Sequence, residues 1–179
     1  MNRRNGEAVH HMTEGPGVGR PRGIFKRETK GAWVETVPVR VERGRVVSFA
    51  RLLGETDPVH VDYLAAQRAG HPDVVAPASF PTVVEMLAKE ERSHRGQPDL
   101  TDVIGCDFRF LLHGEQKYTF HGLMFAGDEV LVSGEVLDFY DKRDGLLEFV
   151  VLKSIISHVD RGVLIHAERI LVHRLGPPA

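Results

Sequence analysis

The chain has 179 residues, of which 42% are hydrophobic and 27% are charged, with a net charge of −2 and a single cysteine, Cys106. These values are typical of one soluble globular domain, and the lone cysteine excludes an intrachain disulfide. No apolar run approaches the about 18 residues of a membrane-spanning helix and no segment resembles a signal peptide, so we expect a cytoplasmic protein that does not enter membranes.

Residues 1–30 differ in composition from the rest of the chain. They are rich in Gly and Arg, carry seven basic against three acidic side chains, and show no apolar periodicity. We therefore expect a flexible N-terminal tail at 1–30, followed by a single domain at 31–179. The tail lacks interleaved aromatic side chains, so we do not expect it to bind nucleic acid.

The domain begins with a predicted strand and a predicted helix. Apolar residues alternate from Trp33 onward, and Pro38 favours an edge position for this strand in a sheet. The predicted inner face of the strand holds Trp33, Val37, Val39 and Val41. Apolar residues then recur at helical spacing up to Gly54, a residue type that commonly ends a helix. The predicted stripe of this helix is Val46, Phe49, Ala50 and Leu53.

A polar, ionisable cluster follows this helix. Glu55, Asp57 and His60 lie five residues or fewer apart, and Pro58 stiffens the backbone between them. Asp57 before Pro58 has the pattern of a helix N-cap, and Asp62 predicts a second helix start for residues 63–69. The cluster is a candidate acid/base site on a short, constrained loop.

A longer apolar helix and a series of strands complete the domain. The helix is predicted from its expected cap, Ser79, to about Ser93, with a charged end at residues 89–92 that leaves the core. Turn signals then separate predicted strands at 103–112, 115–121, 129–140, 146–158 and 163–174. This order predicts an α+β hot-dog fold, in which an antiparallel sheet wraps around a long central helix. Because such a sheet has an exposed edge, we expect a dimer.

Three segments resemble one enzyme family. Gly54–His60, with the sequence GETDPVH, resembles the G-D-x-N-P-x-H signature of MaoC-like (R)-specific enoyl-CoA hydratases. Val75–Pro81 is similar to the A-P-x-T-F-P variant of the 3-hydroxyacyl-thioester dehydratase branch, and Leu112–Tyr118 is also similar to that branch. The resemblance covers residues 33–174, nearly the whole domain.

The resemblance implies reversible addition of water across a trans-2-enoyl thioester, which gives a (3R)-3-hydroxyacyl thioester on CoA or an acyl carrier protein. It implies that His60 works with Glu55, which takes the place of the family's Asp, while Asp57 takes the place of the family's Asn. A backbone N–H of Ala78 or Ser79, before the long helix, is the expected donor to the thioester oxygen. No cofactor is expected beyond the CoA or carrier protein of the substrate, and the expected partner is a second hot-dog subunit in a homodimer or heterodimer.

Two other functions remain open on the sequence alone. In two-subunit dehydratases of this family, the A-P-x-T-F-P pattern belongs to a supporting subunit that shapes the acyl tunnel without catalysing the reaction. A hot-dog thioesterase would instead need a carboxylate on the long helix, such as that of Glu85. The other histidines are scattered without metal-ligand spacing, so no metal site is expected.

Overall fold

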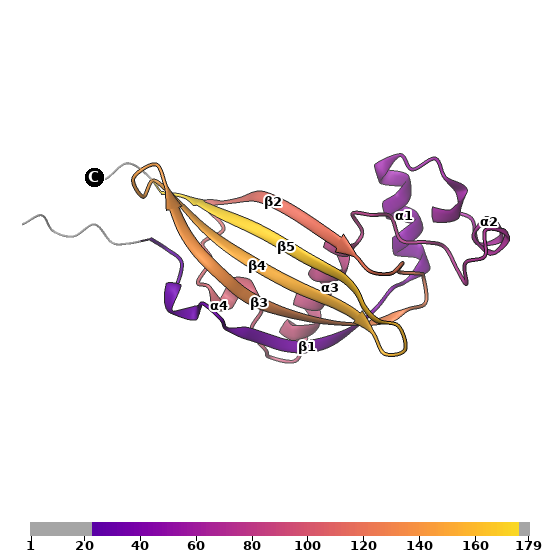
Figure 1. The fold of residues 1–179 in the computed structure, drawn as a ribbon, viewed down its shortest axis with the longest axis horizontal. Helices are drawn as coiled ribbons and strands as arrows, with labels where there is room; N and C mark the ends of the chain where they lie inside the picture. Colours follow the sequence, from indigo (N-terminus) through magenta and orange to yellow (C-terminus); the bar gives the residue numbers. More distant parts are fainter. Residues whose placement is uncertain (1–22, 176–179) are drawn as a thin grey trace, which may run out of the picture.

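Five antiparallel strands form one sheet in the computed structural model, which describes residues 23–175 (Figure 1). The strands are β1 Trp33–Arg40, β2 Leu111–Phe120, β3 Glu129–Lys142, β4 Leu147–His158 and β5 Gly162–Arg174. Their order across the sheet is β1-β3-β4-β5-β2, so β1 and β2 are the two edges. The edge position that Pro38 predicted for the first strand is confirmed.

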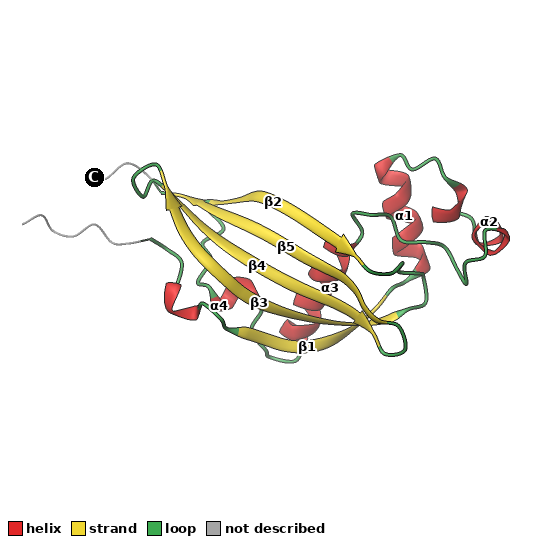
Figure 2. Ribbon diagram, in the orientation of Figure 1, coloured by secondary structure: helices red, strands yellow, loops and turns green. Residues whose placement is uncertain are grey.

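The longest helix lies across one face of the sheet, and two shorter helices lie beyond one end of it (Figure 2). The helices are α1 Arg43–Leu53, α2 Tyr63–Arg68, α3 Pro81–His94 and α4 Leu100–Val103, with single 3-10 turns η1 Arg27–Thr29 and η2 Pro58–His60. We call residues 43–70, which project beyond the sheet, the arm. Among the described residues, no helix has both the length and the hydropathy needed to cross a membrane. The predicted hot-dog arrangement is confirmed, with α3 as the central helix.

The buried face of α3 packs against the sheet. Phe80 directly before the helix, Val84 and Ala88 are fully buried and follow the spacing of an amphipathic helix. They share one core with side chains from β1, β3 and β4, including Val37, Val132 and Ile156. Full burial of a valine or isoleucine stabilises a fold by roughly 1.5–3 kcal/mol, so packing on the sheet fixes the position of α3.

The predicted strand at 103–112 is wrong. Residues Leu100–Val103 form α4, and β2 begins only at Leu111. The reason is a capping box, in which the Asp99 carboxylate caps the first turn and the Asp102 carboxylate accepts the N–H of Asp99 at 2.9 Å. This reciprocal pair starts a helix locally and outweighs the apolar pattern that favoured a strand.

The predicted inner face of β1 is wrong at its first residue. Trp33 is 56% exposed, whereas Val34 is buried together with Val37 and Val39. The pairing of β1 with β3 shifts register between Val34 and Val37. An extra residue at such a bulge reverses the alternation, so Val34 takes the inner position that the sequence assigned to Trp33.

Residues 23–30, the described part of the predicted tail, pack on the sheet. Phe25 is buried, and its ring stacks on His173 with a centroid distance of 4.0 Å. The N–H groups of Ile24 and Phe25 donate to the buried carboxylate of Glu148 at 2.8 and 3.2 Å. The prediction of a flexible tail is therefore wrong for residues 23–30, whereas residues 1–22 lie outside the described part of the chain.

His173 makes this contact sensitive to pH. Burial lowers the pKa of His173 below its ordinary value of 6.5, although the Glu148 carboxylate opposes the shift. The unfolded chain therefore binds the proton first as pH falls, so the stability that His173 contributes is present above about pH 6.5 and is lost below it. We expect the free energy of unfolding, measured in urea, to fall more steeply from about pH 7.5 to about pH 5.5 in the wild type than in His173→Gln. The nine other histidines are the same in both proteins, and equal slopes would exclude this role.

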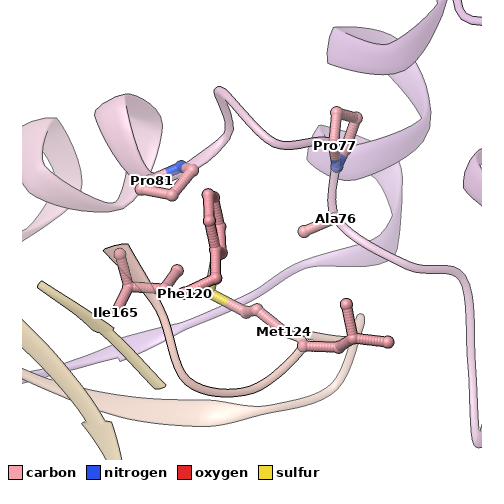
Figure 3. A pocket seen from close by; sticks show the side chains of 7 residues that line it. Ala76, Pro77, Pro81, Phe120, Met124 and Ile165 are labelled. Atoms are coloured by element: carbon pink, nitrogen blue, oxygen red, sulfur yellow. The ribbon is translucent and has the colours of Figure 1, made fainter. Parts of the chain in front are cut away.

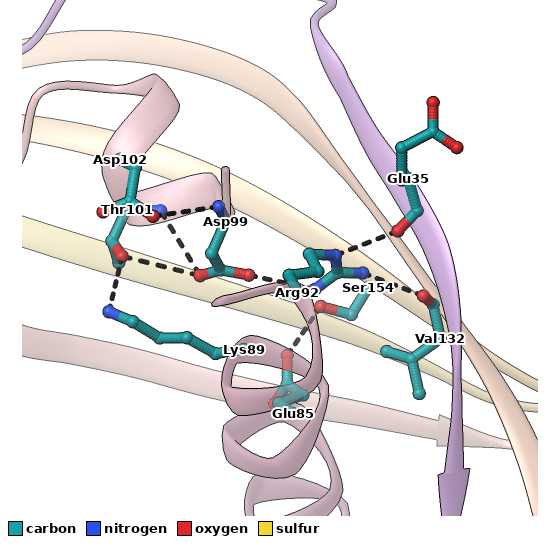
Figure 4. Close-up of polar contacts among 9 residues, drawn as sticks. All are labelled: Glu35, Glu85, Lys89, Arg92, Asp99, Thr101, Asp102, Val132 and Ser154. Atoms are coloured by element: carbon teal, nitrogen blue, oxygen red, sulfur yellow. Dashed lines mark hydrogen bonds and ion pairs between the residues drawn. The ribbon is translucent and has the colours of Figure 1, made fainter. Parts of the chain in front are cut away.

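A buried ion pair joins α3 to α4 and to the sheet (Figure 4). Arg92 is 3% exposed, and its Nη1 donates to the Asp99 carboxylate at 2.9 Å. The same guanidinium donates to the backbone carbonyls of Glu35 and Val132 at 2.9 and 2.8 Å. The charged end of the helix was expected to leave the core, and Arg92 contradicts this because its side chain extends between α3 and the strands.

Candidate active site

The loop between α1 and α2 holds the predicted acid/base residues in a fixed backbone. Gly54 follows α1 with a φ of 72°, a left-handed conformation that glycine adopts without strain. Asp57 caps η2 by accepting the N–H of Val59 at 3.0 Å, with Pro58 at the first position, as predicted. Asp62 caps α2 in the same manner, so the predicted second helix start is confirmed.

His60 is held by the loop that precedes α3. Its Nδ1 lies 2.7 Å from the backbone carbonyl of Val75, and because a carbonyl only accepts, Nδ1 carries the proton and donates. A second bond, from the Val75 N–H to the carbonyl of Val59 at 3.0 Å, fixes the two segments together. In the neutral ring this leaves the lone pair on Nε2, so the partly buried imidazole presents a base at a fixed position.

In the described part of the chain, neither the Glu55 nor the Asp57 carboxylate makes a hydrogen bond or ion pair with the His60 imidazole. Both side chains are exposed. The Asp57 carboxylate is occupied by the cap on Val59, and the Glu55 carboxylate has no hydrogen-bond or ion-pair partner within residues 23–175. The loop therefore supplies one fixed imidazole and two exposed carboxylates, of which Glu55 is the one without a structural contact.

An ion pair fastens the arm to the same loop. Arg43, the first residue of α1, donates from Nε to the Asp73 carboxylate at 2.9 Å. The Arg43 guanidinium is the main cause that lowers the pKa of Asp73 from its ordinary value. Asp73 precedes Val74 and Val75, so this contact and the His60 contact hold opposite ends of one short segment against the arm.

Ala78 and Ser79 lie in an exposed turn at the amino end of α3. Ser79 is not the helix cap: Pro81 takes the first helical position, Phe80 is the N-cap, and no side chain caps the helix. The prediction of a capping Ser79 is therefore wrong by one residue, because proline fits the first turn without needing a donor. The N–H groups of Ala78 and Ser79 have no hydrogen-bond partner among the described residues, so both are available to an acceptor.

A small apolar pocket lies beside this turn (Figure 3). Its cavity volume is about 20 Å³, far below the about 300 Å³ at the lower end of typical ligand pockets. Val75 accepts the hydrogen bond from His60, and the next residue, Ala76, lines the pocket. The lining consists of Ala76, Pro77, Pro81, Phe120, Leu123, Met124 and Ile165. Residues 75–81 therefore carry the carbonyl that holds His60, the two free N–H groups and part of the pocket wall.

The residues at the end of β2 are the part of the pocket that sequence reasoning did not single out. Phe120 and Leu123 are each about half exposed, and no local pattern pairs them with the loop before α3. The only signal was the spacing of Tyr118 and Phe120, which places two aromatic rings on the same face of one strand.

The other candidate side chains lie away from the pocket lining. Glu85 on α3 is 8% exposed and accepts a hydrogen bond from the Ser154 hydroxyl at 2.7 Å. Cys106 is half-buried, and burial raises the pKa of its thiol to about 11, which keeps it protonated at neutral pH. Glu85 lacks the exposure of a reacting group, and the protonated Cys106 thiol lacks the charge of a nucleophile.

Comparison with known proteins places the chain in a family. Residues 28–166 match the family described as "FAS1-like, dehydratase domain region". A UPF0336 protein from Clavibacter michiganensis subsp. michiganensis is 42% identical over 93 residues, which cover 52% of this chain and 58% of the relative. The match to this and two other curated UPF0336 relatives spans about three-fifths of their length.

Two solved structures have the same fold. The HadBC (3R-hydroxyacyl-ACP dehydratase) complex from Mycobacterium tuberculosis superposes with a TM-score of 0.64 at 19% identity, over 80% of this chain and 96% of that chain. A MaoC-like dehydratase superposes with a TM-score of 0.68 at 22% identity, over 83% of this chain and 43% of that one. The fold is thus that of the MaoC-like dehydratases, and with residues 28–166 matched the chain belongs to the FAS1-like dehydratase domain-region family.

Proposed function

We propose that the chain catalyses the reversible hydration of a trans-2-enoyl thioester, carried on CoA or an acyl carrier protein, to the (3R)-3-hydroxyacyl thioester. The observation that carries this proposal is the position of His60, whose Nδ1–H donates to Val75 beside the apolar pocket and leaves Nε2 as a base. The family match to a dehydratase region supports the same class of reaction.

The proposed step uses groups from the loop between α1 and α2 and from the loop before α3. Nε2 of His60 accepts a proton from water while the water oxygen forms a bond to C3 and the electron pair of the C2=C3 bond moves toward C2. The resulting enolate then takes a proton at C2 from the imidazolium of His60, and the exposed carboxylate of Glu55 or Asp57 accepts a hydrogen bond from the attacking water. The free N–H groups of Ala78 and Ser79, near the positive end of α3, donate hydrogen bonds to the thioester oxygen and stabilise the negative charge that develops on it.

We further propose that the working protein is a dimer joined along β2. This edge strand is exposed along most of its length, and Leu112 on it is 54% exposed. An unpaired edge of ten residues favours pairing with a second strand. The partner is a second copy or a related hot-dog subunit, an assembly consistent with the complex of HadB and HadC among the structures of the same fold.

A supporting role beside an active partner is the second candidate. It is favoured by the exposure of Glu55 and Asp57 and by the absence of a contact between either carboxylate and His60 in the described residues. A thioesterase is less well supported, because Glu85 is buried and its carboxylate is bonded to Ser154.

Hydration of crotonyl-CoA by the purified chain tests the proposal. We expect loss of the conjugated double bond without release of free thiol. The same assay is repeated after addition of a paired hot-dog subunit. Turnover only in the mixture would replace catalysis by the supporting role, and free CoA without hydration would identify a thioesterase.

The turn before α3 allows a test of the backbone donors. Ser79→Pro deletes one free N–H, and we expect kcat to fall by about 10²–10³ because the charge on the thioester oxygen loses a fixed donor. Ser79→Ala keeps the N–H, and we expect it to lose less than about threefold. Steady-state kinetics with crotonyl-CoA give both values, and equal losses in the two variants would assign the effect to the hydroxyl or to the fold of the turn.

A further inference from the structure

A contact between α3 and β2 lies directly behind the apolar pocket. The pocket is lined by Pro81 from α3 and Phe120 from β2. Thr82 follows Pro81 on α3, and Tyr118 lies two residues before Phe120 on the same face of β2. The hydroxyl groups of Thr82 and Tyr118 form a hydrogen bond. The rings of Tyr118 and Phe120 are 6.1 Å apart, and Tyr118 packs against the core under α3. The two side chains therefore close the space between helix and strand at the inner end of the pocket.

The interior beyond this contact is polar. Gln116 lies two residues before Tyr118 on the inner face of β2 and pairs with Arg169 of β5. Within the described residues, both amide atoms of Gln116, the Nε of Arg169 and one carboxylate oxygen of Glu85 are buried without a hydrogen-bond partner. An alkyl chain beside these buried atoms would offer them no hydrogen bond, so their unpaired state would persist at a cost in free energy.

We propose that Tyr118 and Thr82 set the acyl chain length of the substrate, and that this chain takes short acyl groups. The inference rests on the proposed function and adds the substrate class to it. Two observations carry it: the side-chain contact that closes the pocket, and the polar atoms where a long tunnel would have to run. The cavity volume of about 20 Å³ leaves no space for a long acyl chain.

The test is the chain-length profile of the full-length protein with trans-2-enoyl-CoA thioesters of four, eight and twelve carbons. We expect the wild type to show kcat/KM at least about tenfold higher for four carbons than for twelve, because the additional methylenes find no apolar space. In Tyr118→Ala the space behind the pocket opens. The ratio of eight-carbon to four-carbon kcat/KM should then rise at least about tenfold, since each methylene that becomes buried adds about fourfold.

Two matched variants keep the result interpretable. Tyr118→Phe keeps the ring and loses the hydroxyl, so it should retain the wild-type chain-length ratio. Tyr118→Val shortens the side chain while it keeps a residue that suits a strand, so it replaces Tyr118→Ala if that variant fails to fold. An unchanged ratio in both shortened variants, or a wild type that prefers twelve carbons, would overturn the inference while leaving the proposed function intact.

Failure of the proposed function would give a different result in the hydration assay. It appears as no hydration of any thioester, either by the chain alone or with a paired subunit. Calorimetric binding of saturated acyl-CoAs of the same lengths then tests the inference. Tighter binding of four carbons than of twelve supports the closed pocket, and tighter binding of twelve carbons overturns it.

Discussion

Replacement of His60 by Ala is expected to lower kcat/KM for enoyl-thioester hydration by about 10²–10⁴, the usual contribution of a positioned general base. The reason is that the Nδ1–H of the imidazole is held by the Val75 carbonyl, one residue before the pocket-lining Ala76, which leaves Nε2 as the base. Steady-state hydration of crotonyl-CoA measures the loss. Because His60 is only partly buried, we expect the variant to fold, with a thermal transition close to that of the wild type.

Two further variants separate chemistry from structure at this position. His60→Asn keeps a donor for the Val75 carbonyl but has no basic nitrogen, so it should be as inactive as His60→Ala. His94→Ala removes an exposed histidine at the far end of α3 and should retain wild-type rates. Activity in His60→Asn near that of the wild type would show that the residue only fixes the loop.

Replacement of Arg92 by Met is expected to lower the free energy of unfolding by about 3–5 kcal/mol. The variant would leave the Asp99 carboxylate buried without its partner, and the carbonyls of Glu35 and Val132 would lose their donors. Breaking one side of a buried pair costs more than replacing both sides, because the remaining charge is not solvated. Urea denaturation followed by circular dichroism gives the value.

The matched control for this prediction is Arg95→Ala. Arg95 makes a partly exposed ion pair with Glu91 on the same helix, so its loss should cost about 0.3–0.5 kcal/mol. The double variant Arg92→Met, Asp99→Leu should regain part of the loss, since it removes the unpaired charge. A cost for Arg92→Met similar to that of Arg95→Ala would mean that the buried pair does not hold α3 to the sheet.

The sequence predicted the sheet and the central helix because their apolar periodicity and turn residues agree. Two of the failures occurred where a local feature competed with that periodicity, and a third at a contact between distant segments. Trp33 faces outward because a bulge changed the alternation, and the segment after Asp99 is helical because a capping box formed there. Phe25 packs on His173 through a contact between segments almost 150 residues apart, which no local pattern reports.

The candidate site was predicted only in part because contacts between distant segments complete it. The loop that bears His60 and the caps at Asp57 and Asp62 are local features, and each formed as predicted. The Val75 carbonyl that orients His60 lies fifteen residues away on another loop. The walls of the pocket come from three separate segments of the chain, so their meeting depends on the packing of the whole domain.

The most direct test of the central claim is a crystal structure of the protein in its native oligomeric state with a (3R)-3-hydroxybutyryl thioester bound. We predict that the hydroxyl on C3 lies within hydrogen-bond reach, about 3 Å, of Nε2 of His60, with the thioester oxygen at the N–H groups of Ala78 and Ser79. An acyl group bound elsewhere, with His60 facing solvent in every subunit, would contradict the account.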